Sequence, residues 1–245
     1  MPSAPANSTL FVVASPLEAR AVISGLHADT SLSDAAPWLP HLLTPSMDFV
    51  ISGVGKSNAA AATSLAIQRR PYRNVICVGI AGALPGADLA LADVVLGSAS
   101  AYADEGIITP TGFQTCQQMG FPLGPFEHNA VPADPELLHH LRPLARQIGV
   151  IATVSTCSGT DAAATAVRAR TGAIAETMEG AAVGHACLLT PPLGHHTPSP
   201  PRFIEVRVIS NTTGDRHRQQ WHMSRALAAL AELGRSLVGT LSQPS

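Results

Sequence analysis

Charged side chains are scarce in this chain, and the basic ones do not cluster. Only 13% of the 245 residues are charged, and 15 Lys and Arg stand against 17 Asp and Glu, which gives a formal net charge of −2. A surface that follows a nucleic-acid backbone needs a patch or stripe of Lys and Arg. Because no such run occurs, we expect no nucleic-acid partner.

Cysteine is also scarce, and the four cysteines lie far apart at positions 77, 116, 157 and 187. They include no C-x-x-C pair, so we expect reduced side chains in the core or in a pocket. The histidine pairs at 139 and 195, and the single His217 and His222, are not spaced with an acid as metal ligands are. We therefore predict neither a metal nor a cofactor.

A secretory signal and a membrane-spanning segment are not apparent either. The first residues, MPSAPANSTL, have no basic region and lead directly into an apolar stretch. The most apolar region, residues 76–97, contains Pro85, Asp88 and Asp93, which a bilayer span does not tolerate. These features predict a cytoplasmic protein with no membrane partner.

Apolar sequence is abundant, since 46% of the residues are hydrophobic. Short runs rich in β-branched residues recur, and such near-continuous apolar strands are typical of a sheet covered by helices on both faces. The runs are LFVVAS at 10, DFVISG at 48, NVICVGIAG at 74, DVVLGSASAYA at 93, GVIATVS at 149 and FIEVRVIS at 203. We predict one α/β domain over residues 1–245, a three-layer sandwich around a central mixed, mainly parallel sheet.

Helical segments with recognisable ends alternate with these runs. KSNAAAATSLAIQRR from residue 56 is rich in Ala, and DPELLHHLRPLARQI from residue 134 has Asp134 as N-cap and Pro135 at the first helical position. TDAAATAVRARTG runs from a Thr cap at residue 160 to Gly172, and a last helix is predicted from about Trp221 to Leu241.

Two stretches are predicted to hold no regular element. Residues 26–47 carry Pro, Ser and Asp without periodicity, and TPPLGHHTPSPP at 190–201 contains five prolines. We expect the second stretch to be a surface connection.

Two glycine-containing segments follow predicted strands. GVGKS at 53–57 is similar to the end of a phosphate-binding P-loop, but that motif needs a Gly where Val50 stands. We interpret it as a turn whose backbone N–H groups, including that of Gly55, face a ligand. GIAG at 79–82 is interpreted as a second such turn, which brings Ile80 and Gly82 to the ligand. For either segment alone, a tight connection without a ligand is the alternative.

Three carboxylates stand at the ends of predicted strands. Glu18 follows the first strand, Glu179 lies in ETMEGAAVGHAC where a strand gives way to a helix, and Asp215 follows the last strand. An acid in so apolar a neighbourhood needs a partner if it is buried, because an unpaired buried charge is costly. For Glu179 that partner is a buried Arg, a helix N-terminus or the hydroxyls of a sugar ligand.

Four segments together resemble the purine nucleoside phosphorylase and nucleosidase superfamily. They are GVGKSNAA, VGIAGALPGADLALADVVLGSASAYADEGIITPTGF, TMEGAAVGHAC and ISNTTGDRHRQQW, in this order. MEGAA is specific to the superfamily, whereas YADEGIITPTGF and the ISN-x-x-G-D-R ending are similar to the futalosine hydrolases within it. The resemblance extends from about Leu10 to Leu241.

This resemblance implies roles for several residues. Glu18 matches the acid that activates the attacking water, and Glu179 matches the acid that binds the ribose 2′- and 3′-hydroxyls, with Met178 beside it at the sugar. Some relatives resemble one another in placing an aromatic residue near STCSGTDA, which contains none here. The contacts expected there are to the backbone and to Ser158 or Thr160, of which we name Thr160. The resemblance also implies a homo-oligomer, a dimer or larger.

Asn211 stands where the adenine-cleaving nucleosidases resemble one another in having an Asp. An acid suits adenine, whereas an amide offers an N–H to O6 of hypoxanthine and a carbonyl oxygen to a protonated N7. Asn211 therefore predicts hypoxanthine as the leaving base. An amide does not act as an acid, so Asp215 is a candidate proton donor; its alternative is a surface ion pair with Arg216 or Arg218.

Phosphorylases of this superfamily resemble one another in a hydroxyl residue within the second glycine segment and an Arg just before it. Here Ile80 and Cys77 occupy those positions, and neither binds phosphate strongly. We therefore predict hydrolysis of the N-glycosidic bond of futalosine to hypoxanthine and dehypoxanthinyl futalosine. The resemblance places this reaction in the futalosine route to menaquinone.

Other functions remain open at the level of the sequence. They are a phosphorylase of 6-oxopurine nucleosides, a nucleosidase acting on inosine, aminofutalosine or methylthioadenosine, and a catalytically inactive nucleoside-binding protein. No residue pattern distinguishes the 5′ substituent, so the choice of futalosine as the purine nucleoside substrate depends on the resemblance.

Overall fold

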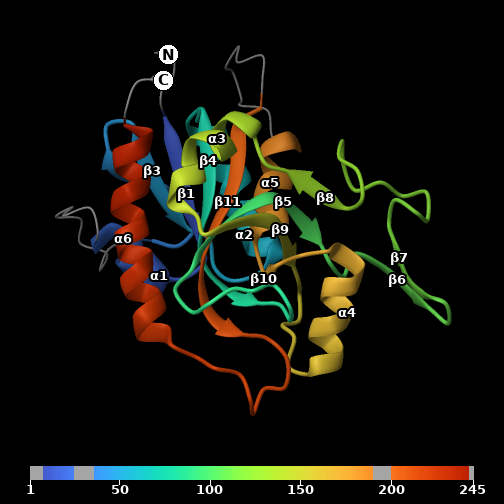
Figure 1. The fold of residues 1–245 in the computed structure, drawn as a ribbon. Helices are drawn as coiled ribbons and strands as arrows, with labels where there is room; N and C mark the ends of the chain where they lie inside the picture. Colours follow the sequence, from blue (N-terminus) through green and yellow to red (C-terminus); the bar gives the residue numbers. More distant parts are fainter. Residues whose placement is uncertain (1–7, 25–35, 190–199, 243–245) are drawn as a thin grey trace.

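The structure is a computed structural model that describes residues 8–24, 36–189 and 200–242. A large mixed sheet carries most of the strands (Figure 1), in the order β10-β9-β5-β11-β4-β1-β3-β2, with β8 paired to β5. The strands are β1 (Thr9–Val13), β2 (His41–Thr44), β3 (Met47–Ile51), β4 (Asn74–Ala83), β5 (Val94–Tyr102), β8 (Ala130–Pro132), β9 (Gln147–Thr153), β10 (Ala175–Thr177) and β11 (Arg202–Thr212).

The strand pairing explains why the sheet is mixed. Strands β3, β1, β4 and β11 run parallel to one another, as do β5, β9 and β10. The two groups meet antiparallel between β11 and β5. Strand β10 also pairs antiparallel with β4, so that β4, β11, β5, β9 and β10 form a closed ring.

Helices cover both faces of the sheet (Figure 1). Helix α6 (Met223–Leu241) packs with α1 (Pro16–Ser24) and α3 (Pro135–Leu141) on one face, and α2 (Lys56–Arg69) packs against α5 (Gly180–Leu189) on the other. Helix α4 (Asp161–Thr171) lies against β9. The predicted three-layer α/β sandwich with a central mixed sheet is confirmed. No helix in the described ranges is long and apolar enough to cross a membrane.

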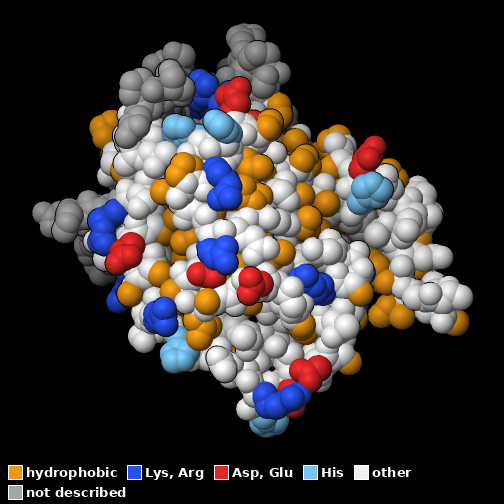
Figure 2. All heavy atoms as spheres, viewed as in Figure 1, with side chains coloured by type: hydrophobic (Ala, Val, Ile, Leu, Met, Phe, Trp, Pro, Cys, Tyr) orange, Lys and Arg blue, Asp and Glu red, His pale blue; other side chains and the backbone are white. Residues whose placement is uncertain are grey.

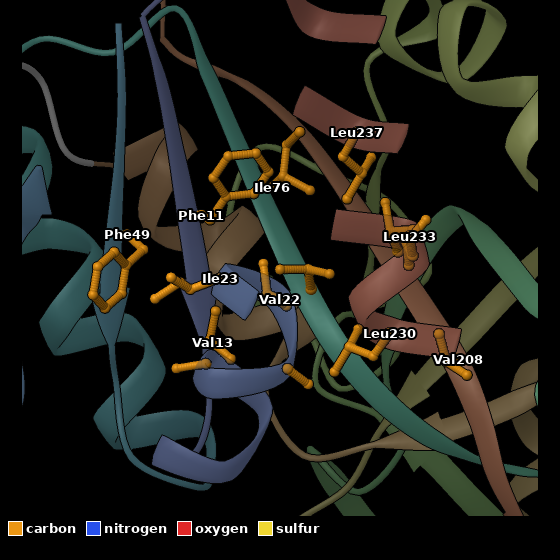
Figure 3. Packing of buried hydrophobic residues seen from close by; sticks show 14 of the residues in the cluster. Phe11, Val13, Val22, Ile23, Phe49, Ile76, Val208, Leu230, Leu233 and Leu237 are labelled. Atoms are coloured by element: carbon orange, nitrogen blue, oxygen red, sulfur yellow. The ribbon is translucent and has the colours of Figure 1, made fainter. Parts of the chain in front are cut away.

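Alternate residues of β1 hold the layers together. Phe11 and Val13 belong to the hydrophobic cluster under α1 and α6, while Leu10 and Val12 belong to the cluster under α2 and α5. This alternation is that of a strand buried on both faces. Figure 3 shows the first cluster, where side chains of β1 and α1 meet those of α6: Phe11, Val13, Val22, Ile23, Leu230, Leu233 and Leu237.

The six apolar runs predicted as strands are confirmed as β1, β3, β4, β5, β9 and β11. The predicted helices from residues 56, 160 and 221 correspond to α2, α4 and α6. The ends of α4 are also as predicted, because the Thr160 hydroxyl accepts a hydrogen bond from the Ala163 N–H at 3.1 Å and Gly172 closes the helix with φ 66°.

The prediction that residues 26–47 hold no regular element is wrong for residues 41–47. The sequence HLLT forms the edge strand β2, which pairs antiparallel with β3, and β3 itself begins at Met47. Residues 25–35, like residues 190–199 of the second predicted loop, lie outside the described ranges.

The helix predicted from residue 134 to 148 is shorter than expected. Helix α3 begins at Pro135 behind the Asp134 N-cap but ends at Leu141. A 3-10 turn at Arg142–Leu144 follows, and Gln147 already belongs to β9. Pro143 explains the stop, since proline lacks the N–H that would continue the helix. Helix α1, by contrast, was not predicted.

All four cysteines are free, as expected. The expected core position holds for Cys77 and Cys187, which are buried, whereas Cys116 is half-buried and Cys157 is exposed.

A separate antiparallel hairpin extends from the body of the molecule on the right of Figure 1. It consists of β6 (Gly106–Thr109) and β7 (Gly112–Thr115). Ile108 on this hairpin is 80% exposed, and Phe121 in the segment that follows is 71% exposed. Figure 2 shows hydrophobic side chains along this part of the surface. Such exposure is typical of a surface that another molecule covers.

Candidate active site

The residues predicted from the sequence converge where several elements meet. Glu18 follows β1, Gly55 follows β3, Ile80 lies in β4, Glu179 directly precedes α5, and Asn211 lies near the end of β11. The parallel strands β1, β3, β4 and β11 present their carboxyl ends at one edge of the sheet, the edge where ligands bind in α/β folds.

Glu18 is held by Ser15 and by β4. The Ser15 hydroxyl donates to Glu18 Oε2 at 2.6 Å, and the Glu18 N–H donates to Ser15 Oγ at 3.2 Å. This is a form of the S-x-x-E capping box, which marks a helix N-terminus and explains α1. The Ile80 N–H donates to Glu18 Oε1 at 2.9 Å. Two elements therefore fix a carboxylate that is only 6% exposed.

Glu179 is buried and has two partners. Its Oε1 accepts from the Gly55 N–H at 3.1 Å, and its Oε2 accepts from Arg207 Nη2 at 3.1 Å. The buried Arg considered in the sequence is therefore present, and Gly55 is the N-cap residue of α2. Each carboxylate oxygen keeps a further lone pair, which a sugar hydroxyl can use.

The two glycine segments act differently from the prediction. The N–H groups of Gly55 and Ile80, which were expected to face a ligand, are donated to Glu179 and Glu18 instead. GIAG is not a turn, because β4 continues to Ala83 and pairs with β11 along this stretch. The N–H groups of Gly55 and Ile80 thus hold the two acids, and contacts of Gly55, Ile80 and Gly82 with the substrate stay predictions.

Gly79 in β4 lets Glu18 and the Arg207 guanidinium approach each other. A Cβ at this position would lie 2.5 Å from Glu18 Oε1 and 2.7 Å from Arg207 Nη1. Both distances are shorter than any ordinary contact, so a side chain here would displace both charged groups. Gly79 is therefore required for Glu18 and Arg207 to occupy the same corner of the site.

Arg207 is the residue that sequence reasoning missed most clearly. It lies in the middle of β11, is 1% exposed, and contacts groups from four other positions. Its Nε donates to Glu205 at 2.9 Å, its Nη2 to Glu179 and to Cys77 Sγ at 3.1 Å each, and its Nη1 to the Ile80 carbonyl at 3.4 Å. The signal was an Arg inside the apolar run FIEVRVIS.

The charges around Arg207 decide its protonation. Burial lowers the pKa of Arg207, but the negative charges of Glu205, Glu179 and Glu18 oppose this, and the pKa lies above its ordinary value. Burial raises the pKa of the Cys77 thiol well above its usual range. The guanidinium therefore stays charged beside a neutral thiol, and three carboxylates surround one cation.

Asn211 is 7% exposed at the end of β11. Its Oδ1 accepts from the Ser210 hydroxyl at 2.8 Å, and its Nδ2 donates to the Thr212 carbonyl at 2.9 Å. Gly82 of β4 lies beside this amide, since a Cβ on Gly82 would be 3.1 Å from Asn211 Nδ2. One N–H and one lone pair of the amide remain for a ligand.

Glu176 is a buried acid that was not predicted from the sequence. It pairs with Gly82 across the β10–β4 ladder, so the two positions share a face of the sheet. Its carboxylate accepts from the Ser158 N–H at 2.8 Å and from the Ser158 hydroxyl at 2.6 Å. Burial raises the pKa of Glu176, while both Ser158 donors lower it. Glu176 thereby fixes the segment after β9.

The remaining predicted residues are less central. Met178 is half-buried and packs on a small hydrophobic cluster next to Glu179. Thr160 is exposed and caps α4. Asp215 lies on the loop after β11, pairs with Arg218 at 3.3 Å and donates its N–H to Asp161. This is one of the two surface ion pairs weighed for it, and nothing joins Asp215 to Asn211 directly.

Comparison with known proteins agrees with this arrangement. Residues 48–239 match the phosphorylase superfamily. The chain is 38% identical to a futalosine hydrolase of Acidothermus cellulolyticus over 90% of this chain and 86% of that protein. It is 34% identical to a futalosine hydrolase of Streptomyces coelicolor over 78% of each. The chain therefore belongs to the phosphorylase superfamily and, within it, to the futalosine hydrolase family.

Solved structures share the fold. A 5′-methylthioadenosine/S-adenosylhomocysteine nucleosidase of Helicobacter pylori has a TM-score of 0.71 at 17% identity, and the match covers 97% of this chain and 98% of that one. A futalosine hydrolase mutant of Helicobacter pylori has a TM-score of 0.70 at 17% identity, with 96% and 98% covered. At this level of identity both show the architecture alone.

Replacing Arg207 by Met should strongly destabilise the protein. The substitution keeps much of the side-chain volume but leaves Glu179 and Glu205 buried without their cation, and breaking a buried pair in this way costs about 3–5 kcal/mol. Urea unfolding monitored by circular dichroism measures the loss. Arg218→Met, which removes an exposed guanidinium from an ion pair with Asp161, is the control and should leave stability nearly unchanged. Equal effects of the two substitutions would contradict the assignment.

Proposed function

We propose that this chain is an N-glycosyl hydrolase that cleaves futalosine to hypoxanthine and dehypoxanthinyl futalosine. The observation that carries the proposal is a pair of buried carboxylates, Glu18 and Glu179, at one edge of the sheet with Arg207 between them. The 38% and 34% identities to futalosine hydrolases over most of the chain support the substrate.

In the proposed mechanism, Glu18 orients a water molecule and removes its proton. Glu179 accepts hydrogen bonds from the ribose 2′- and 3′-hydroxyls, and Met178 packs beside the sugar. As the N-glycosidic bond lengthens, positive charge develops on the ribose. The carboxylates are fixed before the reaction by Ser15, Ile80, Gly55 and Arg207, so they stabilise this charge without having to reorganise.

Water suits this site better than phosphate as the nucleophile. Arg207 is the guanidinium nearest to both acids, but its Nε and both Nη atoms already donate to protein groups. Three carboxylates around a single cation also repel a dianion. From the sequence, phosphorolysis is disfavoured because Cys77 and Ile80 bind phosphate weakly. The contacts of Arg207 and the surrounding negative charge disfavour it further.

Asn211 is the proposed contact to the leaving base. Its remaining N–H suits O6 of hypoxanthine, and its remaining lone pair suits a protonated N7. Gly82 lets Asn211 and Thr213 lie close to β4, since a Cβ there would be 3.1 Å from Asn211 Nδ2 and 2.7 Å from Thr213 Cγ2. Asp215 as the proton donor and Thr160 as a base contact stay predictions.

Hypoxanthine release from futalosine, coupled to xanthine oxidase, tests the proposal. We expect release at the same rate with and without phosphate. The Glu18→Gln variant should lose about 100- to 10,000-fold in kcat, the usual contribution of a positioned general base. Glu136→Gln is the control, because it makes the same change at an acid on the surface, where Glu136 pairs with Arg202. A strictly phosphate-dependent rate, or full activity of Glu18→Gln, would contradict the mechanism.

Changing Asn211 to Asp should shift the choice of base. An acid at this position opposes O6 of hypoxanthine and accepts from the 6-amino group of adenine, and one mismatched buried polar group costs about 1–3 kcal/mol. The ratio of kcat/KM for futalosine to that for aminofutalosine should therefore fall by about tenfold or more. Asn58→Asp on the exposed face of α2 should leave the ratio unchanged. An unchanged ratio in the Asn211 variant would remove Asn211 from base recognition.

We also propose that the chain is a homo-oligomer whose contact includes the β6–β7 hairpin. The support is the exposure of Ile108 and Phe121, since large apolar side chains at the surface mark contact sites. The cytoplasmic location and the single domain over residues 1–245 stay predictions.

Light scattering after size-exclusion chromatography tests the oligomer. We expect a mass of at least two chains for the wild type and a smaller mass for Ile108→Asp, because a charge in an apolar contact is costly to bury. Leu42→Asp, at a position 63% exposed on the edge strand β2, is the control and should leave the mass unchanged. A monomeric wild type with full activity would overturn the proposal.

A further inference from the structure

Glu205 is a fully enclosed acid that the proposed mechanism does not use. It lies on β11 with 0% of its surface exposed. The Thr177 hydroxyl donates to its Oε1 at 2.9 Å, the Ser100 hydroxyl donates to its Oε2 in a short hydrogen bond, and Arg207 Nε donates to Oε1 at 2.9 Å. Strands β5, β10 and β11 each contribute a donor, so both oxygens are satisfied inside the closed ring.

Gly180, the residue after Glu179, leaves space for the Glu205 carboxylate. A Cβ on Gly180 would lie 1.8 Å from Glu205 Oε2 and 2.1 Å from its Cδ. No side chain can occupy position 180 while Glu205 stays in place. Gly180 is the Gly of the MEGAA segment and the first residue of α5. Its lack of a side chain is therefore required by Glu205, which lies 25 positions further along the chain.

Glu205 reaches the site through Arg207. Its contact is with Nε, at the inner end of the guanidinium, while the outer nitrogens donate to Glu179 and to the Ile80 carbonyl. Ile80 in turn donates its N–H to Glu18. With Nε fixed, the planar group has one orientation, and that orientation aims Nη2 at Glu179.

We propose that Glu205 is a positioning residue of the hydrolase: by fixing Arg207 it holds Glu179 for the ribose hydroxyls and keeps the corner shared with Glu18 negative. This inference rests on the proposed roles of Glu18 and Glu179. Because Glu205 is 0% exposed and bonds to Arg207 Nε, its effect on the reaction passes through the guanidinium.

The charge of Glu205 is needed as well as its shape. A glutamine would fill the same space and could still accept from Arg207 Nε through its carbonyl oxygen. It would, however, leave Arg207 with one negative neighbour fewer. The potential at Glu18 would then be more positive, so that Glu18 would be a weaker base and the developing ribose cation would be less well stabilised.

The test is the Glu205→Gln variant, assayed for hypoxanthine release from futalosine across pH. We expect kcat to fall by about 10- to 100-fold, the scale expected when groups at the reaction centre are slightly misplaced, with KM changed by less than about threefold. We also expect the acid limb of the pH–rate profile to move to lower pH by about half a unit or more, because a negative charge has been removed near the base.

A merely structural role gives a different result. It would reduce the fraction of folded protein and lower the rate by the same factor at every pH, without moving the acid limb. The charged and titratable groups that face Arg207 are Glu205, Glu179, Glu18 and Cys77, and Cys77 has a pKa too high to contribute. An unmoved limb, or an unchanged kcat in folded protein, would overturn the proposal.

Action through Arg207 is tested by a double-mutant cycle with Arg207→Lys. If Glu205 works by fixing the guanidinium, the loss from Glu205→Gln should be much smaller in the Lys background, whereas independent effects would add. Additive losses contradict the proposal.

If Glu205→Gln does not fold, the double variant Ser100→Ala and Thr177→Val replaces it. This variant keeps the charge of Glu205 but removes two hydroxyls that donate to its carboxylate. We expect a lower kcat, and an unchanged kcat overturns the proposal.

Failure of this inference can be distinguished from failure of the proposed function. If Glu18→Gln is inactive and Glu205→Gln matches the surface control Glu136→Gln, the hydrolase mechanism stands and the positioning role is wrong. If Glu18→Gln keeps full activity, the proposed mechanism itself is wrong, and the positioning role falls with it.

Discussion

A buried guanidinium is the constraint on which the rest of the structure depends. Placing a cation in the core is unfavourable unless hydrogen bonds and opposite charges surround it, and removal of one partner leaves the others uncompensated. Arg207 meets this requirement with groups from β4, from the start of α5 and from β11. The contacts that compensate this buried cation are therefore the same contacts that orient Glu179, so a change at Arg207 affects both stability and chemistry.

The backbone is shaped to admit these charges. The pairing of β10 with both β9 and β4 closes five strands into a ring, and this ring brings Glu205, Thr177 and Ser100 together from three strands. Two glycines then remove the side chains that would obstruct the charged groups, Gly79 below Glu18 and Arg207, and Gly180 beside Glu205. A larger residue at either position would displace a carboxylate whose position other residues have fixed.

Much of the fold followed from local patterns, because apolar β-branched runs and helix caps are signals carried by neighbouring residues. The edge strand β2 was missed because HLLT is short and lies between prolines, and GIAG was mistaken for a turn because glycine in a strand also permits close packing. Glu18 and Glu179 were singled out by their position at the ends of predicted strands and received their roles from the resemblance, whereas the S-x-x-E signal of Ser15 and Glu18 was overlooked. Arg207 and Glu205 could not be assigned, since the partners that bury them lie far away in sequence: Ser100 is 105 positions from Glu205, and Cys77 is 130 positions from Arg207. Glu176 was missed together with Ser158, 18 positions before it.

The balance of charge in the site connects the structure with the choice of reaction. Three carboxylates around one guanidinium leave the corner between Glu18 and Glu179 with an excess of negative charge. Such a corner stabilises a ribose that becomes cationic as its bond to the base lengthens, and it repels a phosphate dianion that would attack the same carbon. The base end is different, because Asn211 is neutral and offers both a donor and an acceptor. In the proposed mechanism the sugar is thus stabilised by charge and the purine is selected by hydrogen-bond pattern, so rate and specificity depend on two different residues of β11, Arg207 and Asn211.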